Sequence, residues 1–320
     1  MRFWRPRSKK GFILILAAFF LIFLSGCDSI AVFDPKGPVA QRQKDLIMYS
    51  LYFMAGIILV VYVAFTIIVI KYRNHPNRKA SSYKEDLHGN NLLESIWTII
   101  PIVIVTALAI PTISAVFDLE KPPEAAVKEK TKDPLVIYAT SADWKWIFSY
   151  PKESIETVNY LHIPTDRPVE FRLSSTGSMA ALWIPRLGGQ KYNMAGMETI
   201  LYLQADKEGD YRGRNANFTG EGFAEQTFHV HAEKEDTFQS WVKDMQNNAP
   251  KLTQKKYDNI IKPGLVDKQV FSSTHLKWVD HGTHAGMDYF IKRYRDAYED
   301  DMGLKRKNGK SEVDPQEDKN

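Results

Sequence analysis

The side chains of this sequence that could supply soft metal ligands are one cysteine, eight histidines and the methionines. Because Cys27 is the sole cysteine, the chain can form neither an internal disulfide nor a thiolate cluster. His229 and His231 alternate along an expected strand and would share one face. His281 and His284 are spaced as one helical turn would place them. No carboxylate stands at ligand spacing beside either pair, so we expect exposed histidines on a polar surface and no metal site.

Two tryptophans and one glutamate are the other candidates for function. Trp144 and Trp146 alternate, so both indoles would lie on one face of a strand, either in a core or at an interface with another protein. Glu94 stands just before a long uncharged segment. An acid there is either a proton-handling group at a membrane surface or a charge favoured by the dipole at a helix N-terminus.

Two uncharged segments, 46–70 and 95–117, each exceed the roughly 20 residues needed to cross a bilayer. The loop between them is rich in lysine and arginine, which places it in the cytoplasm and both ends of the pair outside. Pro101 and Pro111 fall within the second segment, where neighbouring helices can satisfy the carbonyls that proline frees. We therefore expect residues 27–118 to form a two-helix transmembrane domain whose second helix packs against other protein.

Residues 1–26 have the features of a lipoprotein signal peptide. A basic start precedes the apolar run 12–24, and LSGC follows at 24–27. Cys27 is thus expected to be the lipidated N-terminus of the mature chain, on the outer leaflet, which agrees with the topology above. The alternative is a signal anchor with an incidental cysteine.

The formal net charge of +4 does not indicate nucleic-acid binding. The basic residues gather in the first ten positions, around 71–84 and near the C-terminus, and membrane topology explains the first two clusters. No nucleic-acid partner is expected.

After a charged, proline-containing linker at 119–133, the pattern changes to short β-like runs bounded by turn residues. These runs lie at 134–140, 144–150, 168–175, 199–205 and 226–232. Several short strands with turn signals predict an all-β sandwich over residues 134–235.

A helical segment rich in aromatic residues is expected over 236–290. The apolar stripe of its first helix consists of Phe238, Trp241, Val242 and Met245. A second helix is expected across 253–261, and residues 291–320 are expected to form a charged tail, disordered from Lys305. The predicted fold class is membrane α plus all-β: two transmembrane helices, an external β-sandwich and a C-terminal helical segment.

Four motifs in this order resemble subunit II of the haem-copper oxidases. They are ESIWTIIP at 94–101, DWKWIFSYP at 143–151, WIPRLGGQKYNMAGM at 183–197 and YRGRNANFTGEGF at 211–223. The resemblance extends from the signal peptide to about residue 285 and implies that the sandwich is a cupredoxin domain.

In the members of this family that oxidise cytochrome c, the cupredoxin domain holds two copper ions through cysteine, histidine and methionine side chains. The matching positions in this sequence are Ala180, Asn215, Asn217, Thr219, Phe223 and Gln226. None of them carries a thiolate, imidazole or thioether. Loss of the ligands is the pattern of the quinol-oxidising branch, which this chain also resembles in its aromatic-rich segment from Phe238 onward.

Membership of that branch implies a complex that oxidises quinol, expected to be menaquinol, and reduces dioxygen to water with proton translocation. Haem and copper would lie in subunit I, and this chain would bind no cofactor. Its partners would be subunit I, the small membrane subunits, membrane lipid and quinol.

The resemblance also implies roles for individual residues. The family glutamate that matches Glu94 lies at the entrance of a proton-uptake pathway, and aromatic residues near Trp144 and Trp146 lie near the point where electrons arrive. Subunit II is credited with passing electrons from quinol toward subunit I, but the residues present favour scaffolding, interface and proton access. A lipid-anchored binding or sensor module with a degenerate cupredoxin domain is the alternative.

Overall fold

The computed structural model describes residues 30–73, 89–123 and 133–301, with side chains up to Arg293. The chain divides into two compact units, one of residues 1–119 with 185–189 and one of residues 120–184 with 190–320. Cys27, the signal peptide, most of the 119–133 linker and the tail from residue 302 lie outside the described residues.

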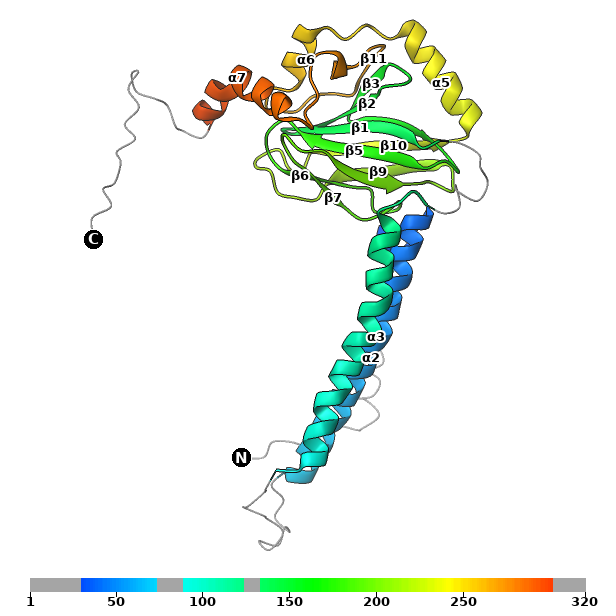
Figure 1. The fold of residues 1–320 in the computed structure, drawn as a ribbon, viewed down its shortest axis with the longest axis vertical. Helices are drawn as coiled ribbons and strands as arrows, with labels where there is room; N and C mark the ends of the chain where they lie inside the picture. Colours follow the sequence, from blue (N-terminus) through cyan, green and yellow to red (C-terminus); the bar gives the residue numbers. More distant parts are fainter. Residues whose placement is uncertain (1–29, 74–88, 124–132, 302–320) are drawn as a thin grey trace, which may run out of the picture. The chain divides into compact units, whose positions relative to one another are not determined.

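The first unit contains two long apolar helices, α2 (Pro38–Tyr72) and α3 (Asn91–Leu119), which run side by side (Figure 1). They contain the predicted segments 46–70 and 95–117. Most of their apolar side chains are exposed in the isolated chain. This surface fits a bilayer, where apolar side chains face lipid.

Pro111 explains a hydrogen bond between the two helices. Proline has no N–H, so it leaves the carbonyl four residues earlier, that of Ala107, without its helical donor. Tyr49 of α2 donates its hydroxyl to this carbonyl over 3.3 Å. At Pro111 the freed carbonyl is thus satisfied by the other helix of the same chain. Packing of this helix against another protein stays a prediction.

The second unit is a sandwich of two sheets (Figure 1). The six-stranded sheet has the order β11-β3-β2-β1-β5-β8 and the five-stranded sheet the order β4-β10-β9-β6-β7. The strands of the first are β1 (Leu135–Ala142), β2 (Lys145–Tyr150), β3 (Ile155–Val158), β5 (Val169–Ser175), β8 (Thr199–Leu203) and β11 (Gln269–Phe271). Those of the second are β4 (Tyr160–Pro164), β6 (Ala180–Trp183), β7 (Lys191–Asn193), β9 (Gly209–Asn215) and β10 (Thr227–Glu233).

The predicted fold class is confirmed, and the five predicted strands correspond to β1, β2, β5, β8 and β10. The core between the sheets is aromatic. Phe228 of β10 packs against Trp146 and Phe148 of β2, with ring centroids 5.4 and 5.0 Å apart, and all three side chains are fully buried. Edge-to-face and tilted pairs of this kind add to the stability gained by burying apolar area.

The C-terminal segment forms a third layer on the six-stranded sheet. It comprises α5 (Glu235–Asn248), α6 (Gln254–Ile260), β11, the short helix η3 (His275–Lys277) and α7 (His284–Asp301). The segment is therefore not wholly helical, since β11 pairs antiparallel with β3, and the boundary expected at residue 290 falls inside α7. Phe238 and Val242 of the predicted stripe are buried, as expected.

The third layer buries both an apolar and a polar part of the sheet. Ile147 and Val158 join a cluster with Tyr257, Ile260 and other apolar residues of the segment. Alternation places Ser149, and its cross-strand partner Glu156, on the same face as Ile147. Neither polar side chain reaches solvent.

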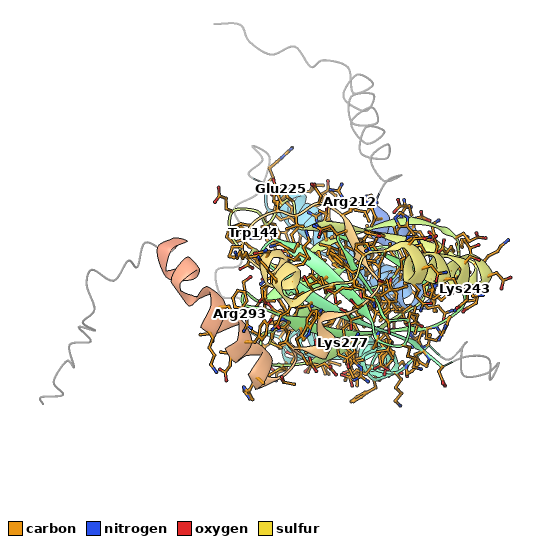
Figure 2. All side chains as sticks on the ribbon, turned by 90° about the horizontal axis from the view of Figure 1, so that it is seen from above. Trp144, Arg212, Glu225, Lys243, Lys277 and Arg293 are labelled. Atoms are coloured by element: carbon orange, nitrogen blue, oxygen red, sulfur yellow. The ribbon has the colours of Figure 1, made fainter. Side chains whose placement is uncertain are left out.

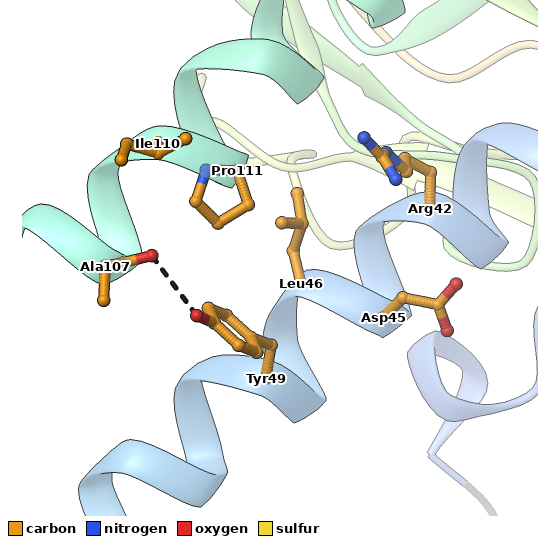
Figure 3. Close-up of a pocket in the computed structure, with 7 residues that line it drawn as sticks. All are labelled: Arg42, Asp45, Leu46, Tyr49, Ala107, Ile110 and Pro111. Atoms are coloured by element: carbon orange, nitrogen blue, oxygen red, sulfur yellow. Dashed lines mark hydrogen bonds between the residues drawn. The ribbon is translucent and has the colours of Figure 1, made fainter.

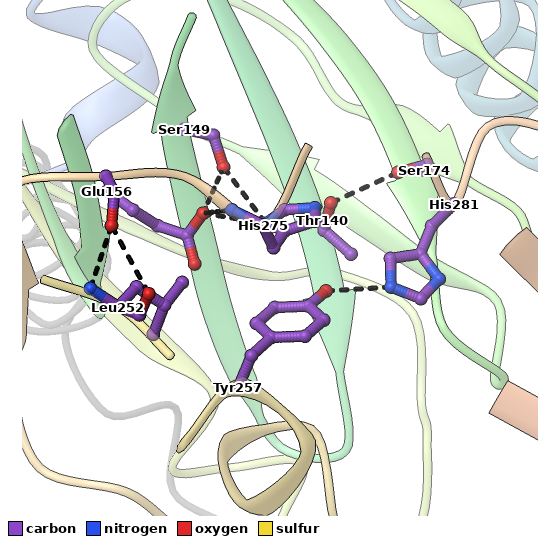
Figure 4. Close-up of polar contacts among 9 residues, drawn as sticks. Thr140, Ser149, Glu156, Ser174, Leu252, Tyr257, His275 and His281 are labelled. Carbon is purple, nitrogen blue, oxygen red and sulfur yellow. Dashed lines mark hydrogen bonds and ion pairs between the residues drawn. The ribbon is translucent and has the colours of Figure 1, made fainter. Parts of the chain in front are cut away.

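Glu156 is matched by a histidine of the third layer. Its Oε2 lies 2.7 Å from Nδ1 of His275, accepts the backbone N–H of His275 at 2.9 Å, and accepts the Ser149 hydroxyl at 2.8 Å (Figure 4). Tyr257 stacks on the His275 ring at 4.5 Å and its hydroxyl lies 2.7 Å from Nε2 of His281. This network links the C-terminal segment to the sandwich, because its hydrogen bonds join Ser149 and Glu156 of the sheet to His275 of the third layer.

His281 corrects one expectation from the sequence. It precedes α7 instead of sharing a helical turn with His284, and it is buried, whereas His284 is exposed. Burial lowers the pKa of His281 to about 3, with a smaller contribution from the neighbouring His275. The ring therefore stays neutral near pH 7 and acts as a hydrogen-bonding partner within the network.

Candidate functional site

The six positions expected from the resemblance gather around the ends of β6, β9 and β10. Ala180 opens β6, Asn215 ends β9, and Gln226 directly precedes β10. Asn217, Thr219 and Phe223 lie in the connection between β9 and β10. Residues far apart in sequence are thus brought to one end of the five-stranded sheet.

Asn215 is the centre of this site. It is buried, and its Oδ1 accepts the backbone N–H of Ala181 and of Asn217, both at 2.9 Å. Its Nδ2 donates to Oγ1 of Thr219 at 3.1 Å and to Oε1 of Gln226 at 2.8 Å. Since a side-chain amide has two donors and can accept two bonds, the hydrogen-bonding capacity of Asn215 is fully used.

Gln226 extends the network toward the opposite sheet. Its Nε2 donates to the carbonyl of Lys145 at 3.3 Å, and its Oε1 also lies 3.2 Å from Oγ1 of Thr219. The connection is closed by Asn217, whose Nδ2 donates to the carbonyl of Met179 at 2.6 Å. Neutral amides and one hydroxyl therefore hold together the segments that carry the six positions expected from the resemblance.

Two of the six positions take no part in these side-chain bonds. Ala180 is buried and has no polar side-chain atom. The ring of Phe223 packs against Phe218, with centroids 5.6 Å apart, and Phe218 is 77% exposed. The remaining donor set does not fit a copper pair, which requires thiolate, imidazole and thioether ligands. No group of three His, Cys, Asp or Glu among the described residues could hold a metal ion.

The two tryptophans differ in accessibility. Trp146 is fully buried and donates its indole N–H to the carbonyl of Gln226 at 3.4 Å. It is a core residue, so the expectation that it could contact another protein is wrong. Trp144 is half-buried at the margin of the domain (Figure 2) and donates to the carbonyl of Thr219 at 2.8 Å.

Gly222 allows Trp144 to lie flat against the β9–β10 connection. A Cβ at Gly222 would come within 2.5 Å of the Trp144 ring, which is closer than real atoms approach. The connection therefore both carries the amide network and seats Trp144. Trp144 is consequently an aromatic ring held in one orientation beside the site.

A buried lysine lies beside the site and was not among the residues singled out from the sequence. Nζ of Lys145 donates to the carbonyl of Asp143 at 2.7 Å and to that of Lys262 at the end of α6. Burial lowers the pKa of Lys145 to about 8, and the nearby Asp143 carboxylate opposes part of this shift. In the sequence, Lys145 stands at a strand position that alternation assigns to solvent, so nothing marked it as a buried residue.

Comparison with known proteins places the chain in a family. A family model described as cytochrome c oxidase subunit II, transmembrane domain, matches residues 29–115. The chain is 58% identical to quinol oxidase subunit 2 of Bacillus subtilis strain 168, over 85% of this chain and 84% of that protein. It is 49% identical to quinol oxidase subunit 2 of Bacillus cereus, over 90% of this chain and 96% of that protein.

The chain belongs to the quinol oxidase subunit 2 family.

The chain is similar to further proteins. A protein of Staphylococcus haemolyticus named probable quinol oxidase subunit 2 is 46% identical over 88% of this chain and 73% of that protein. Among solved structures, the chain is similar to the periplasmic domain of cytochrome oxidase subunit II of Bradyrhizobium japonicum. That likeness has 20% identity and a TM-score of 0.35, and covers 36% of this chain and 96% of that one.

Glu94 lies in the first turn of α3 and is exposed. Asn90 caps the helix, because its Oδ1 accepts the backbone N–H of Leu92 at 3.1 Å and of Leu93 at 3.2 Å. The carboxylate of Glu94 therefore stands near the positive end of the helix dipole and is also accessible to protons. Both interpretations of this residue remain open.

The other histidine pair lies away from the amide network. His229 and His231 share one face of β10, with ring centroids 6.3 Å apart, and Nδ1 of His229 lies 3.0 Å from the Asp210 carboxylate. Both side chains are partly exposed, as the sequence predicted. Their partner is an acid on the neighbouring strand β9.

We predict that Asn215→Ala lowers the free energy of unfolding by about 1–3 kcal/mol, because it leaves the buried N–H of Ala181 without an acceptor. The measurement is chemical denaturation of the purified chain followed by tryptophan fluorescence. Asn248→Ala, at an exposed helix position, is the control and should change stability by less than about 0.5 kcal/mol. Equal effects of the two substitutions would show that the network does not stabilise the domain.

Proposed function

We propose that this chain is subunit 2 of a membrane complex that oxidises quinol and reduces dioxygen to water. The observation that carries the proposal is 58% identity, over most of both chains, to a protein named quinol oxidase subunit 2. The amide network supports the choice of electron donor, since Asn215, Thr219 and Gln226 offer no ligand set for the copper pair of cytochrome c oxidising relatives.

In this proposal the chain supports the reaction without carrying electrons on a metal of its own. Haem and copper belong to subunit I, and the quinol is menaquinol. The sandwich contributes a rigid external surface, with Trp144 at its margin as the candidate contact to subunit I. Small membrane subunits complete the complex.

The proposed orientation places the sandwich outside the cell and the loop between α2 and α3 in the cytoplasm. The basic residues of that loop support this orientation through the positive-inside rule. Proton translocation by the complex then has an uptake side at the beginning of α3, where Glu94 lies.

Purification of the intact complex through a tag on this chain tests the proposed function. Haem absorbance and quinol-dependent oxygen consumption should accompany the chain at constant ratio. A lipid-anchored binding or sensor module, the alternative function, would purify without haem, and that outcome would overturn the proposal.

We further propose that Glu94 collects protons bound for the oxygen-reducing centre. Its exposure and its position in the first turn of a membrane helix support this role. Glu94→Gln keeps size and hydrogen bonding but removes the titratable proton. Turnover should fall severalfold while haem content and quinol affinity stay unchanged, and Glu94→Asp should retain more activity.

The measurement is steady-state oxygen consumption of the purified complex with haem content as the normaliser. Undiminished turnover of Glu94→Gln would mean that the carboxylate serves only the helix dipole. Loss of assembly would identify a structural contact instead, which equally contradicts proton uptake as its function.

Cys27 is proposed to carry a diacylglyceryl group after removal of residues 1–26. The lipobox LSGC and the lack of any other cysteine support this assignment. Cys27→Ala should yield an uncleaved precursor that stays in the membrane fraction, because two spanning helices retain it without lipid. Mass spectrometry of the N-terminal fragment distinguishes the forms, and an unmodified, uncleaved Cys27 in the unaltered chain would refute the proposal.

A further inference from the structure

A groove of about 480 Å³ lies between α2 and α3 (Figure 3). Its walls are Arg42, Asp45, Leu46, Tyr49, Ala107, Ile110 and Pro111. All of them belong to the helical unit, and Leu46 points toward Pro111 across the groove (Figure 3). The volume is within the range of small-molecule sites, which usually span about 300–1,000 Å³.

The groove crosses the boundary between the polar and apolar parts of the helices. Asp45 is the last charged residue before the uncharged stretch of α2, and Asp118 is the first after that of α3. Arg42 and Asp45 therefore lie at headgroup depth. Leu46, Ile110 and their neighbours lie at the edge of the hydrocarbon core.

The Arg42 guanidinium keeps most of its hydrogen-bonding capacity for a ligand. Among the described residues, Arg42 approaches the Asp118 carboxylate at 3.5 Å, and its side chain is 47% exposed. A guanidinium has five N–H donors in a planar fork that matches a phosphate. An exposed ion pair this long contributes little stability, so a phosphate can share the arginine at small cost.

The acids beside Arg42 favour a ligand that carries a positive charge as well as a phosphate. Asp45 accepts a hydrogen bond from the Gln41 side chain at 2.8 Å and is exposed at the edge of the groove. Asp45 and Asp118 together would repel a headgroup that is purely anionic. They would attract an ammonium group that lies a few bonds from the phosphate.

We propose that this groove binds the headgroup of a zwitterionic aminophospholipid, of the phosphatidylethanolamine type. The phosphate lies against Arg42 and the ammonium group against Asp45, which matches each charge of the headgroup with its opposite. One acyl chain begins along Leu46, Ile110 and Pro111. A primary ammonium donates hydrogen bonds to the carboxylate, whereas a choline headgroup has no N–H to donate.

Pro111 and Tyr49 help to shape the site. The hydroxyl of Tyr49 already donates to the Ala107 carbonyl. The end of the groove nearer the hydrocarbon core therefore presents the aromatic ring of Tyr49 rather than a free donor. Aromatic side chains at the membrane interface suit this depth. The site requires only that the two helices span a membrane, so it does not depend on the proposed function of the complex.

The test uses the intact complex with Ile110 replaced by a photoreactive phenylalanine analogue, reconstituted in nanodiscs of defined lipid. Each disc contains phosphatidylethanolamine, phosphatidylglycerol and phosphatidylcholine in equal proportion. After irradiation, the lipids attached to this chain are identified by mass spectrometry. Phosphatidylethanolamine should predominate severalfold, and excess inorganic phosphate should leave the yield unchanged because it lacks the ammonium and the chain.

Arg42→Gln should reduce the phosphatidylethanolamine adduct about tenfold, as expected for one charge-assisted hydrogen bond. Asp45→Asn should abolish the preference over phosphatidylglycerol while leaving some adduct. Lys44→Gln removes one positive charge on the same turn of α2 without touching the groove wall, and should have no effect. Haem content of each variant checks that the complex is assembled.

Three outcomes would overturn the proposal. Equal labelling of the three lipids, unaffected by Arg42→Gln, would mean contact with ordinary bilayer lipid only. Attachment of the probe to another subunit would show that protein fills the groove. A quinone adduct in place of phospholipid would assign the groove to the substrate instead.

Discussion

The hydrogen bonds of Asn215 are the constraint on which the end of the sandwich depends. One buried amide joins the N–H of Ala181, the N–H of Asn217 and the side chains of Thr219 and Gln226. A metal pair would cross-link the same segments through charged thiolates, with the added possibility of electron transfer. The amide network also cross-links these segments, but it cannot transfer electrons. Trp144 depends on it as well, because the carbonyl that accepts the indole N–H belongs to Thr219.

The sequence predicted the order and type of the long elements but not the third layer. The length of the uncharged segments identified both membrane helices. Runs bounded by turn residues identified five strands, and an apolar stripe identified α5. Strands such as β7 and β11 are three residues long and show none. Lys145, Ser149 and Glu156 occupy the face of the sheet that alternation assigns to solvent. They are buried because the C-terminal segment folds back over them, and only the tertiary structure reveals that Glu156 meets His275 there.

The resemblance could name the residues of the candidate site, but not the hydrogen bonds that they form. The resemblance named six positions, and the structure places them at one end of the five-stranded sheet. The hydrogen bonds among Asn215, Thr219 and Gln226 depend on loop geometry that no sequence spacing determines. Alternation likewise assigned Trp144 and Trp146 to one face and could not tell which is accessible. The difference arises because β2 begins at Lys145: Trp146 lies inside the strand between two layers, whereas Trp144 precedes it and rests on the β9–β10 connection.

Both units pair polar groups within the protein where the surroundings cannot do so, although one unit faces water and the other is suited to lipid. In the sandwich, Glu156 and Asn215 are paired within the protein because water is excluded. In the helices, the carbonyl freed by Pro111 is paired with Tyr49 because lipid offers no donor. The helix pair nevertheless leaves most of its apolar surface uncovered by the chain itself. At Pro111 the freed carbonyl is paired within the chain, and the apolar surface that remains is suited to lipid or to another membrane subunit.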